Sequence, residues 1–122
     1  MTMRVLVLDD YLSIRLGLKR LLESFGYEVI LTAHPTEALE AMLRDPADVV
    51  LTDYSMPEMD GIEFAAELDR IWQGPILLMT GYDGREFLQV QADALAVGIR
   101  KIFAKPGFEG LEEELRVLSN FL

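Results

Sequence analysis

Short apolar segments alternate with amphipathic segments along the whole chain of 122 residues. The continuous apolar segments are typical of strands buried on both faces, and they predict strands over residues 4–8, 28–32, 48–52, 76–79 and 101–104. The segments between them carry apolar residues at helical spacing, and they predict helices over residues 12–25, 35–44, 61–71, 85–97 and 111–122. Strands that alternate with helices form a parallel sheet with helices on both faces. The sequence therefore predicts one α/β domain.

The apolar spacing also predicts which side of each helix faces the core. In the fourth helix, Leu88, Ala92 and Leu95 share one stripe. We therefore expect these three side chains to pack against the sheet.

The composition excludes several classes of protein. The chain has no cysteine and one histidine, His34, which excludes a disulfide framework, a cysteine-bound zinc site and a cluster of histidine ligands. Its formal net charge of −10 disfavours direct binding to nucleic acid, which depends on clustered basic side chains. No apolar stretch is long enough to cross a membrane, and the first residues lack the pattern of a secretory signal. We expect a cytoplasmic protein without a membrane partner.

Polar residues that could take part in binding or catalysis follow four of the predicted strands. They are Asp9 and Asp10 after the first strand, Asp53 after the third, Thr80 after the fourth and Lys105 after the fifth. Taken singly, each has an ordinary structural explanation, since such residues also cap helices and form turns. The carboxyl ends of parallel strands share one edge of the sheet, however, and ligands bind at that edge. We therefore expect the five side chains to form one site.

This set of residues indicates phosphoryl chemistry. Three carboxylates that share a pocket repel one another and require a cation. Oxygen ligands without cysteine or histidine favour Mg²⁺ or a similar hard ion. A carboxylate can act as a nucleophile, while Thr80 and Lys105 can contact phosphoryl oxygens. The sequence therefore predicts a metal-assisted phosphoryl acceptor on an aspartate.

Four motifs carry a family resemblance. They are Val5-Leu-Val-Leu-Asp-Asp10, Leu51-Thr-Asp-Tyr-Ser-Met-Pro-Glu-Met-Asp-Gly61, Leu78-Met-Thr-Gly81 and Phe103-Ala-Lys-Pro106. In order and spacing, the chain resembles the receiver domain of two-component response regulators, in particular the single-domain regulators of chemotaxis. The resemblance covers essentially the whole chain. It implies a flavodoxin-like fold with strand order 2-1-3-4-5 and a single receiver domain over residues 1–122.

The resemblance also implies a function. Asp53 would accept a phosphoryl group from a phosphohistidine on a sensor histidine kinase or a histidine phosphotransfer protein, and the modified domain would then change its binding to a downstream protein. Asp10, Asp53 and the backbone carbonyl of Ser55 would bind Mg²⁺ (or Mn²⁺) directly, and Asp9 would hold the ion through water. The domain would catalyse only its own phosphorylation and dephosphorylation, so it would not be an enzyme in the usual sense.

The resemblance assigns the remaining site residues to the phosphoryl group and to the switch. Thr80 would move toward the phosphoryl group, Lys105 would pair with it, and the Lys105–Pro106 peptide would be cis. The chain departs from the family at Ile102, where the family often has an aromatic residue that follows the threonine inward. Phe103 is adjacent, but neighbouring strand residues face opposite sides of a sheet.

Two further features concern the loops around the site. The segment from Thr80 to Gly98 is a few residues longer than usual for the family, which predicts an atypical fourth helix. Ser55 and Tyr82 lie two residues after Asp53 and Thr80, at positions that tune the lifetime of the phosphoryl group in the family.

Two other functions remain open from the sequence. A degenerate receiver would act as an interaction module without phosphate, and Ile102 mildly favours it. A phosphatase with an aspartyl-phosphate intermediate would need a second acid two residues after Asp53, where Ser55 stands. Nucleotide enzymes are disfavoured because the chain has no glycine-rich phosphate-binding motif. The sequence names neither the kinase nor the target, and it leaves open whether the domain acts alone or within a longer protein.

Overall fold

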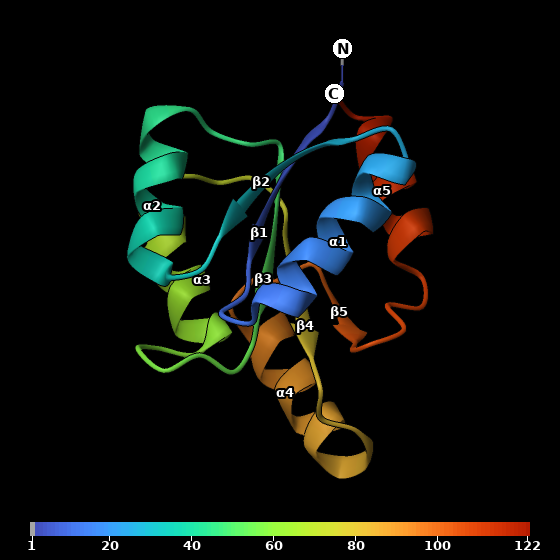
Figure 1. Cartoon of the computed structure of the whole chain (residues 1–122). Coiled ribbons are helices and arrows are strands. Elements are labelled where there is room, and N and C mark those ends of the chain that lie inside the picture. The colour runs from blue at the N-terminus through green and yellow to red at the C-terminus, as the bar shows by residue number, and fades with distance from the viewer. Residues whose placement is uncertain (1) are drawn as a thin grey trace.

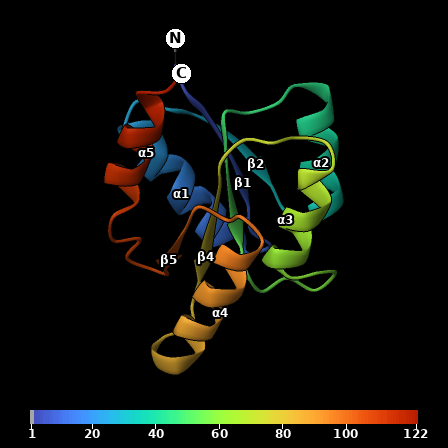
Figure 2. The same ribbon diagram turned by 180° about the vertical axis from the view of Figure 1, so that it is seen from behind.

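The protein is a three-layer sandwich in which a parallel sheet lies between two layers of helices (Figures 1 and 2). The computed structural model describes residues 2–122. Within them, the sheet has five strands in the order β2-β1-β3-β4-β5, and all neighbours pair in parallel. This order confirms the flavodoxin-like fold that the family resemblance implied.

Each predicted strand is present, and two of them run one residue further than predicted. The strands are β1 (Arg4–Leu8), β2 (Glu28–Thr32), β3 (Val49–Asp53), β4 (Ile76–Thr80) and β5 (Lys101–Ala104). β3 starts at Val49, one residue later than predicted, and the carboxylate of the preceding Asp48 accepts a hydrogen bond from the backbone N–H of Arg4 at 2.7 Å. Asp53 and Thr80 are thus the last residues of their strands rather than loop residues.

Each predicted helix is also present, with changes at the ends. The helices are α1 (Leu12–Ser24), α2 (Pro35–Arg44), α3 (Gly61–Asp69), α4 (Gly84–Ala96) and α5 (Leu111–Ser119). The prediction ran α3 as far as Ile71, but the helix ends at Asp69 and Ile71 is exposed. The prediction also ran α5 to the last residue, whereas Phe121 and Leu122 follow the helix as exposed side chains.

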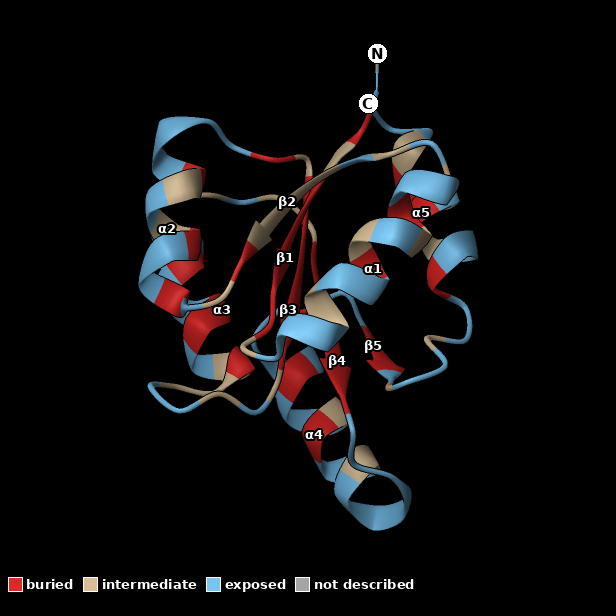
Figure 3. Ribbon diagram, viewed as in Figure 1, coloured by how far each residue is buried: buried red, intermediate tan, exposed pale blue. Residues whose placement is uncertain are grey.

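The apolar side chains form one core on each face of the sheet. The face that includes Leu6, Val50 and Leu78 packs against α2, α3 and α4, while the opposite face packs against α1 and α5. Figure 3 shows the buried strands between the two helix layers. Ile102 lies in the first core and Phe103 in the second, so Phe103 does not replace the missing aromatic side chain at Ile102.

The helix α4 packs with a different face from the one the sequence predicted. The prediction placed Leu88, Ala92 and Leu95 against the sheet, but Ala92 is exposed and the two leucine side chains are 63% and 55% exposed. Val90 and Ala94 are buried instead, and Phe87 packs beside them. The helix carries apolar residues on two sides, and the period alone does not distinguish them.

Within residues 2–122, no helix combines the length and the apolar character needed to cross a membrane.

Candidate functional site

The carboxyl edge of the sheet brings the predicted site residues together. Asp9 and Asp10 follow β1, Asp53 ends β3, Thr80 ends β4 and Lys105 follows β5. In the sheet, β3 lies between β1 and β4, and β5 is the next strand. The structure therefore confirms the prediction that these residues lie together at one edge of the sheet.

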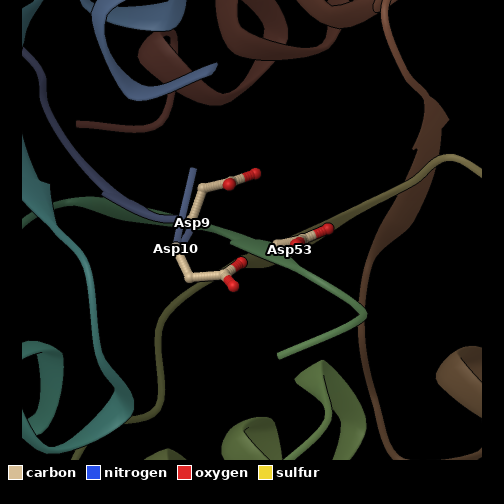
Figure 4. Close-up of side chains that lie close together, drawn as sticks. All are labelled: Asp9, Asp10 and Asp53. Carbon is tan, nitrogen blue, oxygen red and sulfur yellow. The ribbon is translucent and has the colours of Figure 1, made fainter. Parts of the chain in front are cut away.

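The three carboxylates form a tight cluster. Asp9, Asp10 and Asp53 each offer an oxygen, and these oxygens all lie within 4.8 Å of one another (Figure 4). The Asp9 side chain is fully buried, Asp53 is 2% exposed, and Asp10 is half-buried. Charges this close and this buried repel strongly, because little water screens them.

Lys105 partly neutralises the cluster. Its Nζ lies 2.9 Å from Oδ1 of Asp53 and 3.2 Å from Oδ2 of Asp9. The Lys105–Pro106 peptide is cis, as expected. A second cation lies beside the cluster, since the Arg15 guanidinium donates to the backbone carbonyl of Asp9 at 2.8 Å. Lys105 and Arg15 are two positive charges against three carboxylates, so the cluster keeps an excess of negative charge.

The pKa values of two site residues reflect this balance. Burial raises the pKa of Asp53 above its usual value, and the charges of Asp9 and Asp10 act in the same direction, although the hydrogen bond from Lys105 opposes them. Burial acts to lower the pKa of Lys105, but the hydrogen bond and charge of Asp53, together with Asp9, outweigh it and raise that pKa. The ammonium of Lys105 therefore stays charged at neutral pH.

Asp9 and Asp10 have different surroundings although they are adjacent in sequence. Both oxygens of Asp9 are engaged, one by the N–H of Tyr11 at 2.8 Å and the other by Lys105. The Oδ1 of Asp10 is buried and has no hydrogen-bond partner within residues 2–122. An unpartnered buried carboxylate oxygen beside two other carboxylates is what a hard cation would satisfy. The residues therefore fit a site for Mg²⁺ or a similar ion.

Thr80 presents its hydroxyl to the same region. Its Oγ1 accepts a hydrogen bond from the N–H of Tyr82 at 3.1 Å, which leaves its own O–H free to donate. The backbone carbonyl of Thr80 accepts from the N–H of Lys105 at 2.8 Å, so the two residues are tied together through the backbone.

An open cleft of about 560 Å³ exposes the site to solvent. Asp10, Asp53, Thr80 and Lys105 line it, whereas Asp9 does not, since its side chain is fully buried. Its mouth is formed by Tyr11, Ser55, Met56, Pro57, Gly81 and Tyr82.

Sequence reasoning missed the place of Tyr11 and Pro57 at this mouth. No periodic pattern marks them, because they lie in loops. The available signal was their place in the loops that follow β1 and β3, which puts them at the same edge of the sheet.

The loop after Asp53 is held by a glycine. A Cβ at Gly61 would lie 2.5 Å from the carbonyl oxygen of Asp53 and 2.6 Å from Cδ1 of Leu78. Asp60 and Glu63 close a reciprocal capping box at the start of α3. The loop therefore returns close against β3 and fixes the backbone beside Asp53.

Comparison with known proteins gives one family. The family model described as "Response regulator receiver domain" matches residues 5–116. Sporulation initiation phosphotransferase F of Bacillus subtilis is 30% identical over 107 residues, which cover 87% of this chain and 84% of that protein. A protein-glutamate methylesterase/protein-glutamine glutaminase of Halobacterium salinarum is 38% identical over 103 residues, which cover 84% of this chain and 29% of that protein.

Solved structures agree with the family model. The structure of chemotaxis protein CheY4 of Vibrio cholerae matches with a TM-score of 0.80 and 32% identity, over 100% of both chains. The lengths of the curated relatives differ: the chain spans 29% of the Halobacterium methylesterase but 84% of the Bacillus phosphotransferase.

Proposed function

The chain belongs to the family of response regulator receiver domains, and from this premise we propose that it is a phosphorylation-controlled switch in which Asp53 accepts the phosphoryl group. Receiver domains act in phosphorylation-dependent signalling, and membership of the family implies this general function for the chain. The observation that carries the proposal for Asp53 is its position at the floor of an open cleft, among Asp10, Thr80 and Lys105.

In the proposed transfer, a carboxylate oxygen of Asp53 forms a bond to phosphorus while the bond from phosphorus to the donor's nitrogen breaks. The bonding electron pair leaves with the donor nitrogen, which takes a proton from solvent. Lys105 already contacts Oδ1 of Asp53, so we assign the attack to the other oxygen. Because Asp53 is only 2% exposed, the donor must approach from the cleft.

Lys105 and Thr80 would then hold the transferred group. Lys105 can move its ammonium from the Asp53 carboxylate to a phosphoryl oxygen, and the Thr80 hydroxyl can donate to another. Drawing Thr80 toward the group would strain its hydrogen bond with Tyr82 and pull on the loop before α4. This movement would change the surface around the loop before α4, so that the charge added at Asp53 alters what the protein can bind.

We propose Mg²⁺ (or Mn²⁺) as the cation of this site. Asp10, Asp53 and the backbone carbonyl of Ser55 would hold it directly, and Asp9, whose oxygens are both engaged, would act through water. When bound, the ion offsets negative charge on the transferring group.

The test uses a phosphoryl mimic. Beryllofluoride added to protein that already holds Mg²⁺ should change the NMR or fluorescence spectrum further, and the same addition to the Asp53→Asn variant in Mg²⁺ should cause no further change. If neither beryllofluoride nor acetyl phosphate alters the wild-type spectrum or mass, the proposal fails. Turnover of a small phosphate ester would instead support a phosphatase, and a partner that binds wild-type and Asp53→Asn protein equally would support a phosphate-independent module.

The proposed phosphoryl donor and output are those typical of the family. The donor would be a phosphohistidine on a sensor histidine kinase or a histidine phosphotransfer protein, and the output would be binding to a downstream protein. We propose that residues 1–122 form one domain that acts in the cytoplasm and does not contact nucleic acid, in line with its net charge of −10. It would catalyse only its own phosphorylation and dephosphorylation.

A further inference from the structure

Arg15 contacts the acidic site from α1 although it does not line the cleft. Its Nη1 donates a hydrogen bond to the backbone carbonyl of Asp9 at 2.8 Å. The side chain of Arg15 is half-buried, so the guanidinium is held against the protein rather than extended into solvent. The proposed transfer gives this contact no role.

Helix stability does not explain a basic residue at this place in α1. Arg15 is the fourth residue of the helix, close to the positive end of the helix dipole, where a basic side chain is unfavourable. The first turn holds no acidic residue, and the N-cap residue Tyr11 makes no side-chain capping bond. The contact with the Asp9 carbonyl beside the carboxylate cluster is therefore the interaction that accounts for Arg15 within residues 2–122.

The carbonyl that Arg15 binds belongs to the peptide group that joins Asp9 to Asp10. A peptide group is planar, so a hydrogen bond to its oxygen also fixes the direction in which the Cα of the next residue lies. The N–H of Asp9 donates to the carbonyl of Thr32 at 3.2 Å and holds the chain before this peptide. Arg15 holds the peptide itself, and with it the backbone that carries Asp10.

The position of Asp10 depends on this peptide more than that of Asp9 does. The carboxylate of Asp9 accepts hydrogen bonds from the N–H of Tyr11 and from Lys105, so it is held independently. The Oδ1 of Asp10 is buried and has no hydrogen-bond partner within residues 2–122. Rotation of the Asp9–Asp10 peptide would therefore move the Asp10 carboxylate relative to Asp53, which lies beside it (Figure 4).

We propose that Arg15 is a positioning residue for the cation site: it holds the Asp9–Asp10 peptide, keeps the Asp10 carboxylate aimed at the cluster, and thereby raises the affinity for Mg²⁺. This inference rests on the proposed cation and adds to its site a residue outside the cleft. Groups that orient metal ligands typically change the affinity for the metal by about 10- to 100-fold. Because Arg15 acts through the backbone, we expect a smaller factor of about 3 to 10.

The positive charge of Arg15 acts in the opposite direction. A guanidinium beside the cluster repels a cation, so removal of the charge alone would increase the affinity for Mg²⁺. The hydrogen bond and the charge thus predict changes of opposite sign, and added salt weakens only the charge effect. A loss of affinity when Arg15 is replaced therefore points to the hydrogen bond.

The experiment measures Mg²⁺ binding by NMR titration of the full chain. Backbone amide signals are followed as Mg²⁺ is added at two ionic strengths, and each variant gives a dissociation constant. Arg15→Met removes the guanidinium but keeps a long unbranched side chain, and it should raise the constant about 3- to 10-fold. Arg20→Met removes the same charge from an exposed position of α1, and it should leave the constant within about twofold of wild type.

Two further measurements make the result specific. Arg15→Lys keeps the charge and a hydrogen-bond donor, so its dissociation constant should lie closer to wild type than that of Arg15→Met. In an Asp10→Asn background, Arg15→Met should have little further effect, because Arg15 acts through Asp10. Melting curves without Mg²⁺ establish that each variant is folded at the temperature of the titration.

The outcomes separate this inference from the proposed function. An unchanged or lower dissociation constant in Arg15→Met, or an equal rise in Arg20→Met, overturns the role of Arg15 and leaves the proposed function standing. A constant as high in Arg15→Lys as in Arg15→Met, or an undiminished effect of Arg15→Met in the Asp10→Asn background, also overturns it. If the wild-type protein does not bind Mg²⁺, the proposed cation itself fails, and the role of Arg15 fails with it.

Discussion

Single side chains divide the acidic cluster into a structural part and a reactive part. Asp9 is fully buried, and both its oxygens are already hydrogen-bonded, so it acts mainly as a fixed negative charge that holds Lys105. Asp10 retains an unpartnered oxygen, and Asp53 lines the cleft. The sequence predicts that these residues meet, because strand ends share an edge. The family resemblance also implied that Asp10 and Asp53 would hold the metal directly and Asp9 through water, whereas the hydrogen bonds that Asp9 accepts from Tyr11 and Lys105 needed the structure.

Asp10 should control the affinity for the metal. Mg²⁺ at 100 times its dissociation constant should stabilise the wild-type protein by about 2.7 kcal/mol. Asp10→Asn should lose most of this gain, because it removes the carboxylate with the unpartnered oxygen. The measurement is the melting temperature during a Mg²⁺ titration, with Asp69→Asn on the exposed surface as the control. An undiminished gain in Asp10→Asn would contradict this assignment.

Neutralising Asp53 should stabilise the metal-free protein. Its raised pKa means that the folded state binds a proton more tightly than the unfolded state, so its ionisation lowers the free energy of unfolding as pH rises from 3.8 through the raised value. At pH 7, Asp53→Asn should therefore be more stable than wild type, because the variant carries no charge that burial penalises and Lys105 keeps its contact with Asp9.

Denaturant titrations at several pH values check the Asp53 prediction. The difference between Asp53→Asn and wild type should be full at neutral pH and should shrink as pH falls toward 3.8. A variant that is less stable at pH 7, or a difference that grows in acid, would show that Lys105 fully compensates the Asp53 charge.

At the scale of whole elements, the helix α4 shows where sequence patterns stop being informative. It carries apolar residues on two sides, one with Leu88 and Leu95 and the other with Val90 and Ala94. Both sides satisfy helical spacing, and the structure buries the side with Val90 and Ala94. The inner strands β3 and β4 were predictable because burial along their whole length makes them almost continuously apolar.

Truncating a side chain on the buried side of α4 should lower the free energy of unfolding more than truncating one on the exposed side. Val90→Ala should lower the free energy of unfolding by about 1–3 kcal/mol, because Val90 is 5% exposed and packs in the core. Leu88→Ala should change it by less than about 0.5 kcal/mol, because Leu88 is 63% exposed. Denaturant unfolding of both variants measures these values. Equal losses would mean that Leu88 is buried in solution.

The stability of the protein should also depend on the glycine at the start of α3, which lets the loop after β3 pack closely. Gly61→Ala should destabilise the protein by more than about 2 kcal/mol, because its Cβ would meet the Asp53 carbonyl and Leu78. Gly17→Ala is the matched control, since a Cβ at Gly17 in α1 meets nothing within 4 Å. That change should stabilise the protein by roughly 0.5–1 kcal/mol. Thermal unfolding compares the two, and a neutral Gly61→Ala would show that the loop can move away from β3.

At the scale of the molecule, the sheet order turns scattered residues into one site. Residues that are far apart in sequence, such as Asp9 and Lys105, contact each other because β1, β3, β4 and β5 are neighbours along one edge. Periodicity predicted the strands and helices but not their order, which came from the family motifs. The distances within the cluster and the tyrosines at its mouth needed the structure, because they depend on loop paths.

The net charge of −10 is a property of the whole molecule with a local consequence. The acidic cluster sits in a chain that already repels anions, so a negatively charged donor would need the attraction of Lys105 and of the proposed cation together. The absence of cysteine fits a site built from oxygen ligands and one ammonium.

The most direct test of the central claim is to identify the modified residue. The protein is incubated with Mg²⁺ and phosphoimidazole, and borohydride then reduces any aspartyl phosphate to homoserine, which peptide mass spectrometry locates. We predict homoserine at position 53 and none at Asp9 or Asp10, and no product in the Asp53→Asn variant. Homoserine at another aspartate, or phosphate retained on His34 with none at Asp53, would contradict the account.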